Sequence, residues 1–131
     1  MPGKFVPASE AVRETLDWGT LGWMCHPPVG ASQLTVIDVD IIPGQGHNFH
    51  KHPDQEEVIF VVEGEVEQWL EQEKRILKAG DSLFIPKGVV HASFNMTDKN
   101  IHLLAILGPC VGDGGYEMVE VFEEAPWNSL R

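Results

Sequence analysis

Three histidines and one glutamate have the residue types and spacing of a metal site. His50 and His52 stand two residues apart, and alternate residues of a β-strand point to the same face. The turn-forming residues after His52 break this strand, so that Glu57 can open the next strand on the same face. His91 comes from a distant strand. Three neutral imidazoles and one carboxylate suit a divalent transition metal, namely iron(II), manganese, nickel, zinc or copper.

Strand parity alone does not choose between Glu56 and Glu57 as the fourth ligand. The turn residues around these side chains, however, form two blocks of fixed spacing. The blocks read Gly44, five residues, His50-x-His52, four residues, Glu57, six residues, Gly64; and Gly80, five residues, Pro86-x-Gly88, two residues, His91, three residues, Asn95. Every fixed position matches, so residues 44–95 resemble the paired signature motifs of the cupin superfamily. The six-residue gap to Gly64 favours Glu57 over Glu56.

The resemblance implies an all-β fold, a double-stranded β-helix or jelly-roll barrel, with a metal inside its mouth. It also implies that His50, His52, Glu57 and His91 are the metal ligands. The rest of the sequence is consistent with such a barrel, since short β-branched and apolar runs end at glycine or proline every 8–12 residues or so. We expect strands near 34–42, 58–62, 66–70, 75–77, 82–85, 91–95, 101–107 and 116–122, and one helical turn over 9–16, capped by Ser9.

The length of 131 residues predicts one domain, with its motif core at 44–95 and an amino-terminal extension, 1–33, that packs on the barrel. Two segments, 58–62 and 101–107, are apolar at both strand parities, whereas a half-buried strand should alternate. Either the amino-terminal segment covers the second face, or a subunit interface does. The second alternative predicts a homodimer.

Composition excludes several classes of function. The net charge of −11 argues against binding to nucleic acid or to anionic membranes, because no basic face releases their counterions. No apolar run is long enough to span a membrane and no secretory signal is visible, so we expect a cytoplasmic protein. The two cysteines, Cys25 and Cys110, are too few for a disulfide scaffold.

Other residues near the motifs are weaker candidates. His47 has the opposite parity to His50, so in a regular strand it faces away from the metal. His26 lies apart from the motifs, and His102 lies in an apolar strand where a core or interface role is expected. Cys110 belongs to a glycine-rich loop, 108–115, that is either a mobile lid or an ordinary connection.

The pattern favours a small-molecule metalloenzyme, dioxygenase-like or lyase-like, with Glu57 as a possible base. Arginine occurs only as Arg13, Arg75 and Arg131, none at an inward position of the motif strands. A pocket for phosphates or free carboxylates usually contains a guanidinium fork, so we expect a neutral or metal-chelating organic substrate, such as an enolate or an aromatic diol. The alternatives are a non-catalytic, metal-dependent module that binds a small molecule or sugar, and an isomerase that uses the metal as a Lewis acid.

Overall fold

The computed structural model describes residues 2–131, and nearly all of its regular structure is β-strand. The three short 3-10 helices are η1 (Ala8–Glu10), η2 (Pro27–Val29) and η3 (Trp127–Ser129). The strands are β1 (Val12–Leu16), β2 (Gly19–Cys25), β3 (Thr35–Ile41), β4 (Gly46–Lys51), β5 (Glu56–Glu63), β6 (Glu65–Leu70), β7 (Glu73–Lys78), β8 (Ser82–Ile85), β9 (His91–Phe94), β10 (Ile101–Gly108) and β11 (Val119–Glu120).

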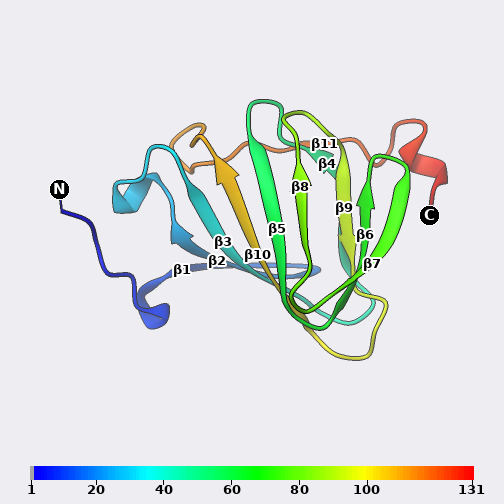
Figure 1. Ribbon diagram of the computed structural model, residues 1–131, viewed down its shortest axis with the longest axis horizontal. Coiled ribbons are helices and arrows are strands. Elements are labelled where there is room, and N and C mark those ends of the chain that lie inside the picture. Colours follow the sequence, from blue (N-terminus) through cyan, green and yellow to red (C-terminus); the bar gives the residue numbers. More distant parts are fainter. Residues whose placement is uncertain (1) are drawn as a thin grey trace.

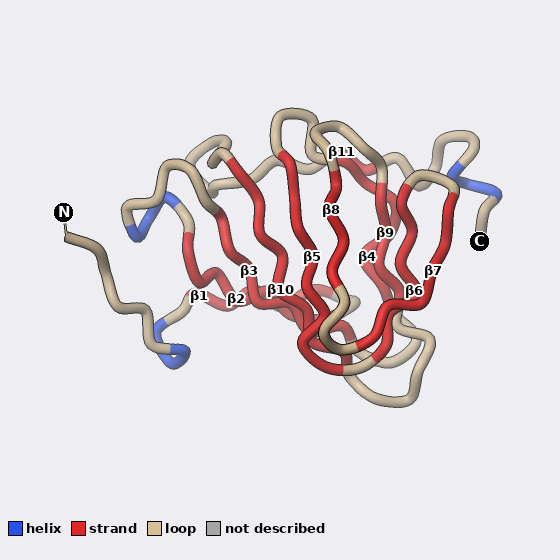
Figure 2. The backbone as a smooth tube through the Cα atoms, in the orientation of Figure 1, coloured by secondary structure: helices blue, strands red, loops and turns tan. Residues whose placement is uncertain are grey.

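These strands form two antiparallel sheets that face one another (Figures 1 and 2). The larger sheet has the order β1-β2-β3-β10-β5-β8, and the smaller has the order β11-β4-β9-β6-β7. Sequence neighbours such as β3 and β4 lie in opposite sheets, which is the connectivity of a jelly roll. The predicted all-β jelly-roll fold is confirmed.

The space between the sheets is filled by alternating apolar side chains. In β3, buried positions alternate with half-buried ones, and Ile37, Val39 and Ile41 point inward. They pack with Leu103 and Leu107 of β10, the neighbouring strand. This alternation follows from strand geometry, and it fills the barrel interior with apolar side chains.

A second apolar cluster covers the outer face of the smaller sheet. Phe49, Trp69 and Phe94 point away from the barrel interior and pack with Val121 and with the partly buried Trp127 of η3. The carboxyl-terminal segment therefore acts as a cover for β4, β6 and β9, and η3 lies beside this end of the barrel in Figure 2.

The motif residues Gly64 and Asn95 have structural roles. Gly64 has φ +91°, and a Cβ there would lie 2.6 Å from the Ile101 side chain, so the turn between β5 and β6 requires glycine. The Asn95 amide is fully buried and donates to the carbonyls of Ile41 (2.9 Å) and Lys99 (2.7 Å). Gly64 thus allows the tight turn between two strands, and Asn95 links the end of β9 to β3 and to the loop before β10.

The amino-terminal region differs from the sequence expectation. The helical turn predicted over 9–16 is wrong, because only Ala8–Glu10 is helical and Val12–Leu16 pairs with β2. Ser9 caps no helix, since the cap position is Pro7. β1 and β2 extend the edge of the larger sheet beyond β3. At the other end, the strand predicted over 116–122 shrinks to Val119–Glu120.

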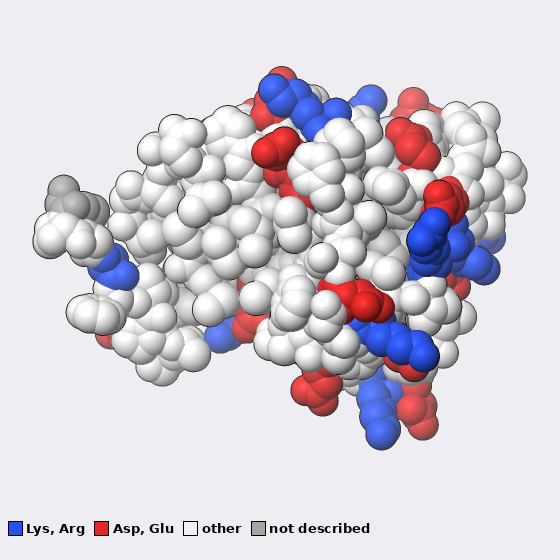
Figure 3. Space-filling view, viewed as in Figure 1, with Lys and Arg blue, Asp and Glu red and all other residues white. Residues whose placement is uncertain are grey.

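The outer face of the larger sheet is apolar and accessible. Phe60, Val62 and Phe84 are 37%, 39% and 53% exposed. Val58 pairs with Phe84 of β8 and with Ile106 of β10, so these side chains belong to one surface. Figure 3 shows few charged side chains over β3, β10 and β5. No helix within residues 2–131 is long and apolar enough to cross a membrane.

Candidate metal centre

A β-bulge in β4 decides which histidines face the barrel interior. His47 pairs with Ser93 and His50 pairs with His91, so three steps along β4 oppose two steps along β9. The extra residue turns both His47 and His50 inward, whereas Phe49 points to the outer cluster. The expectation that His47 faces away from the site is therefore wrong, because it assumed a regular strand.

The structure brings together the side chains that the motifs indicated. One ring nitrogen from each of His50, His52 and His91 lies within 4.8 Å of the others, and all three residues are buried. Glu57 Oε1 lies 3.2 Å from His52 Nε2 and 3.0 Å from His91 Nε2. The four side chains come from β4, the residue after it, β5 and β9, and so join the two sheets at one point.

Each imidazole is oriented by a backbone carbonyl on the side away from this cluster. His50 Nδ1 lies 2.7 Å from the Asn48 oxygen, and His91 Nδ1 lies 3.0 Å from the Val89 oxygen. His52 Nδ1 lies 2.6 Å from the Glu117 oxygen. A carbonyl only accepts, so Nδ1 of each ring carries the proton and Nε2 presents a lone pair to the cluster. This is the tautomer that a metal-ligating histidine needs.

The donor set fits a divalent metal. Glu57 Oε1 and His91 Nε2 are both buried without an aligned hydrogen bond, although they lie at ion-pair distance. A lone pair on nitrogen and a carboxylate oxygen repel unless a proton or a cation lies between them. Three nitrogens and one oxygen that converge in this way match the ligand preferences of iron, manganese, nickel, copper and zinc.

The electrostatics of the cluster favour a neutral His50 and an ionised Glu57. Burial and the neighbouring His47 hold the pKa of His50 well below 6.5. Burial raises the pKa of Glu57, but a proton at His52 or His91 Nε2, in the position that a cation would take, outweighs burial and brings the pKa to about 2. These are the protonation states in which both residue types bind metals.

His47 extends the cluster into a stack of three rings. Its ring lies parallel to that of His50, with centroids 3.7 Å apart, and Trp18 stacks on its other side at 4.8 Å. His47 Nε2 lies 3.0 Å from the sulfur of Met118, and His47 is not one of the three histidines whose ring nitrogens converge. Burial and the nearby His91 lower the pKa of His47 to about 3.

The barrel mouth is crossed by residues 109–118, here called the mouth segment. It connects β10 of the larger sheet to β11, which pairs with His50 and Lys51 of β4. Its Tyr116 ring lies 5.4 Å from that of His52, and burial raises the Tyr116 pKa to about 12, so the phenol stays protonated. Sequence reasoning missed Tyr116 and Glu117, and Glu117 could not have been found from its type because it acts through its backbone carbonyl.

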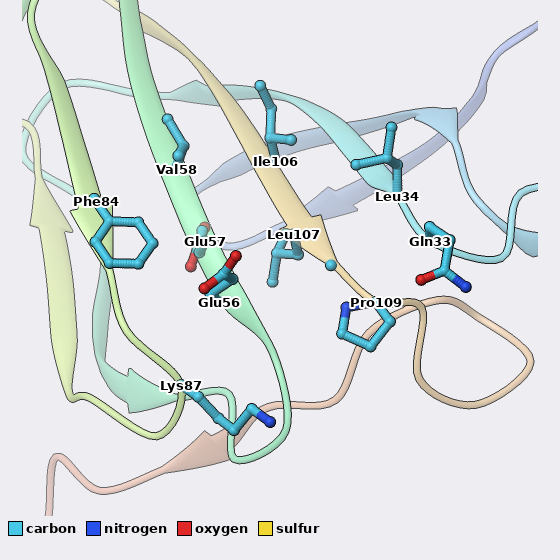
Figure 4. Close-up of a pocket in the computed structure, with 11 residues that line it drawn as sticks. Gln33, Leu34, Glu56, Glu57, Val58, Phe84, Lys87, Ile106, Leu107 and Pro109 are labelled. Carbon is cyan, nitrogen blue, oxygen red and sulfur yellow. The ribbon is translucent and has the colours of Figure 1, made fainter.

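Glu56 and Glu57 lie on opposite faces of β5, as the spacing to Gly64 predicted. Glu57 is 5% exposed inside the barrel, whereas Glu56 is exposed. Figure 4 shows Glu56 in front of β5, above an outer groove, and Glu57 behind the ribbon.

The other titratable candidates lie outside the ligand cluster. His26 stacks on Trp23, and His102 pairs with Asp38 on the outer face of β3 and β10. Cys25 and Cys110 are free thiols that both approach the Leu34 carbonyl, at 3.6 and 3.2 Å. None of these side chains belongs to the group of described residues suited to hold a metal.

The cavity beside the cluster is small and apolar. It has a volume of about 40 Å³, and its apolar lining includes Val39, Ile59 and Leu103, together with His47, His50, Glu57 and His91. The arginines lie elsewhere: Arg13 and Arg131 pair with Asp38 and Glu67, and Arg75 is exposed beside Glu73. The described cavity lining therefore contains no guanidinium to hold an anionic substrate.

Residues 37–107 match the family model described as Cupin domain. The chain belongs to this family. The match includes the larger part of both sheets and all four clustered side chains.

Curated relatives match over shorter stretches. An uncharacterized protein, YdbB, of Bacillus subtilis is 48% identical over 46 residues, which are 34% of this chain and 41% of YdbB. A protein named polyketide synthase CurC, of Streptomyces cyaneus, is 36% identical over 67 residues, which are 51% of this chain and 44% of CurC. The matched stretch thus spans less than half the length of either relative.

A solved structure shows the same fold over nearly the whole cupin chain. The polyketide cyclase RemF from Streptomyces resistomycificus superposes with a TM-score of 0.76 and 20% identity, covering 95% of this chain and 90% of RemF. At this identity the likeness concerns the fold.

Proposed function

We propose that this cupin is a metal-dependent enzyme that acts on a small, neutral or metal-chelating organic molecule. Its ligands are His50, His52, Glu57 and His91. The observation that carries the proposal is the common orientation of the three imidazoles, each with Nδ1 on a carbonyl and Nε2 toward one carboxylate. The metal is iron, manganese, nickel, zinc or copper, and when bound it polarises a substrate oxygen and acidifies the adjacent C–H or O–H bond.

The residues around the cluster define what the protein itself contributes. We also propose Glu57 as the base of the site, a role that requires its ionised carboxylate to leave the metal before it accepts the substrate proton. The apolar side chains beside the cluster, among them Ile59 and Leu103, limit the access of water to it. The names of CurC and RemF refer to polyketides, whose enolic and phenolic oxygens are of the chelating kind. The proposed reaction is either the insertion of dioxygen into the substrate, as in a dioxygenase, or the non-hydrolytic cleavage of a substrate bond, as in a lyase.

The test is a comparison of oxygen uptake and product formation. Protein loaded with iron(II) or manganese is mixed with β-diketones and aromatic diols, with and without oxygen. Oxygen consumption in step with substrate loss supports a dioxygenase, and anaerobic bond cleavage supports a lyase. Saturable binding without turnover by any loaded form would contradict the enzyme and favour a binding module, and conversion to an isomer alone would favour the Lewis-acid isomerase.

We further propose that the chain is a homodimer in which the outer faces of the two larger sheets pack together. The apolar surface of β5, β8 and β10 continues into a groove of about 450 Å³, whose lining includes Glu56 and Lys87 (Figure 4). Opposite charges on a self-complementary face can pair across a two-fold axis. The corresponding face of the smaller sheet already has its cover from the same chain.

The dimer is tested by light scattering. The chain has a mass of 14.6 kDa, so the native protein should give twice that value. Phe60→Lys, at the centre of the apolar face, should give the monomer mass. Ile76→Lys is the matched control, because Ile76 is an exposed apolar residue of β7 in the other sheet. A native monomer would contradict the proposal.

A further inference from the structure

The backbone carbonyls that orient the three imidazoles do not all come from the same part of the chain. The carbonyls that hold His50 and His91 belong to Asn48 and Val89, each two residues earlier in the chain. His52 instead depends on Glu117, 65 residues away in the mouth segment. The neighbouring backbone therefore fixes the orientation of the His50 and His91 rings. The orientation of the His52 ring depends on the position of the mouth segment.

A buried amide holds the mouth segment at this point. Gln55 is 2% exposed and lies between His52 and Glu57 in the chain. Its Nε2 donates to the Pro109 oxygen at 2.7 Å and to the Gly115 oxygen at 2.9 Å. Its Oε1 accepts from the Glu117 N–H at 3.3 Å. Gln55 thus binds the amide nitrogen of Glu117, the residue whose carbonyl binds His52.

We propose that Gln55 is a positioning residue that sets the tautomer and orientation of His52 through the backbone of Glu117. The inference rests on the proposed metal site for its consequence, but the contacts that carry it belong to the protein alone. When Glu117 is held, the His52 proton stays on Nδ1 and Nε2 keeps its lone pair for a metal.

Loss of Gln55 gives His52 a competing partner. His52 Nε2 lies 3.2 Å from Glu57 Oε1, within hydrogen-bond reach. A ring that no longer donates to Glu117 gains by moving its proton to Nε2 and donating to the Glu57 carboxylate. That tautomer uses two metal-binding atoms in one hydrogen bond. The two arrangements of His52 exclude one another, and the Gln55 amide selects the one that leaves both atoms available.

The chain offers a matched control for general loosening of the mouth segment. Thr35 Oγ1 donates to the same Gly115 oxygen, at 2.8 Å, but makes no hydrogen bond with Glu117. Thr35→Val keeps the side-chain shape and removes this hydrogen bond. Gln55→Met keeps nearly the length of the side chain and removes all three Gln55 contacts. Gln55→Glu places a carboxylate against the Pro109 and Gly115 carbonyls, so it should displace the segment even if Gln55→Met fails to fold.

The experiment is nitrogen-15 NMR of the imidazoles in the metal-free protein, followed by zinc titration. In the native protein and in Thr35→Val, all three rings should be protonated at Nδ1. In Gln55→Met and Gln55→Glu, His52 alone should become protonated at Nε2, and the zinc dissociation constant should rise by about 10- to 100-fold.

An unchanged His52 tautomer in folded Gln55 variants would overturn the inference, as would an equal effect of Thr35→Val. A native protein that shows the expected tautomers but binds no metal would contradict the proposed function and leave the role of Gln55 standing.

Discussion

Glu57 Oε1 and His91 Nε2 lie 3.0 Å apart inside the barrel without an aligned hydrogen bond. The His91 proton is on the other nitrogen, which faces the Val89 carbonyl at 3.0 Å. Two electron-rich atoms are therefore held face to face by elements of different sheets, β5 and β9. A bound cation removes their repulsion, and the stability of the cluster is expected to depend on it.

The first prediction separates the two adjacent glutamates. Glu57→Gln keeps the side-chain shape but removes the charge, so metal content should fall at least about tenfold while the barrel stays folded. Glu56→Gln should leave metal content unchanged, because Glu56 is exposed on the other face of β5. Elemental analysis together with circular dichroism measures both outcomes. Metal loss in Glu56→Gln alone would mean that the register of β5 is shifted by one residue.

The second prediction concerns the ring stack. His47→Ala removes the ring between Trp18 and His50 and should lower stability by about 0.5–1.5 kcal/mol for each lost ring contact. His47→Phe should restore much of this loss. Both variants should keep their metal, because His47 Nε2 faces Met118. If His47→Ala lost as much metal as a variant of His50, the His47 ring would have to be a ligand.

The third prediction is the pH dependence of the metal-free protein. The pKa values of His47 and His50 are lower in the folded chain than the usual 6.5, so the unfolded state binds more protons in this range. The contribution of these two histidines to the free energy of unfolding is therefore fully present above about pH 7. It falls as the pH drops through 6.5, by up to about 1.4 kcal/mol per pH unit for each imidazole. Glu57 adds a further loss between about pH 4.5 and pH 2.

Urea unfolding of metal-free protein at pH 7.5, 6 and 5 measures this loss. His47→Phe removes one of the two imidazoles and should reduce the slope. Equal free energies of unfolding at the three pH values would contradict the neutral, buried state of these histidines.

The fourth prediction concerns metal removal. A ligand that binds only the folded state raises the melting temperature, by an amount that grows with the ratio of metal concentration to dissociation constant. A chelator should therefore lower the melting temperature at pH 7.5. Protons compete with the metal for the same ligand atoms, so the shift should be smaller at pH 5 than at pH 7.5. A melting temperature that the chelator leaves unchanged at both pH values would argue against a bound metal.

The sequence predicted the features that depend on fixed spacing. The glycine and proline positions predicted an antiparallel β-barrel, the resemblance to the cupin motifs implied the jelly roll, and the gap between Glu57 and Gly64 favoured Glu57 over Glu56 as the inward residue. His47 was assigned to the wrong face because a β-bulge depends on pairing with β9, which no local pattern records. The dimer and the cytoplasmic location stay predictions.

Contacts made through backbone atoms also could not be predicted from the sequence. Glu117 acts through its carbonyl, so its residue type carries no information, and its partner His52 is 65 residues away. The loop 108–115 was expected to be either a mobile lid or an ordinary connection. In the structure, Gln55 and Thr35 bind its Gly115 carbonyl by buried hydrogen bonds.

The most direct measurement is the metal stoichiometry of protein purified without added metal, compared with that of His50→Ala, His52→Ala and His91→Ala. His102→Ala is the control, since His102 pairs with Asp38 on the outer face. We predict about one transition-metal ion per chain in the native protein and the control, and less than about one tenth of that in each of the three variants. A native protein without transition metal, or ligand variants that keep it, would contradict the metal centre.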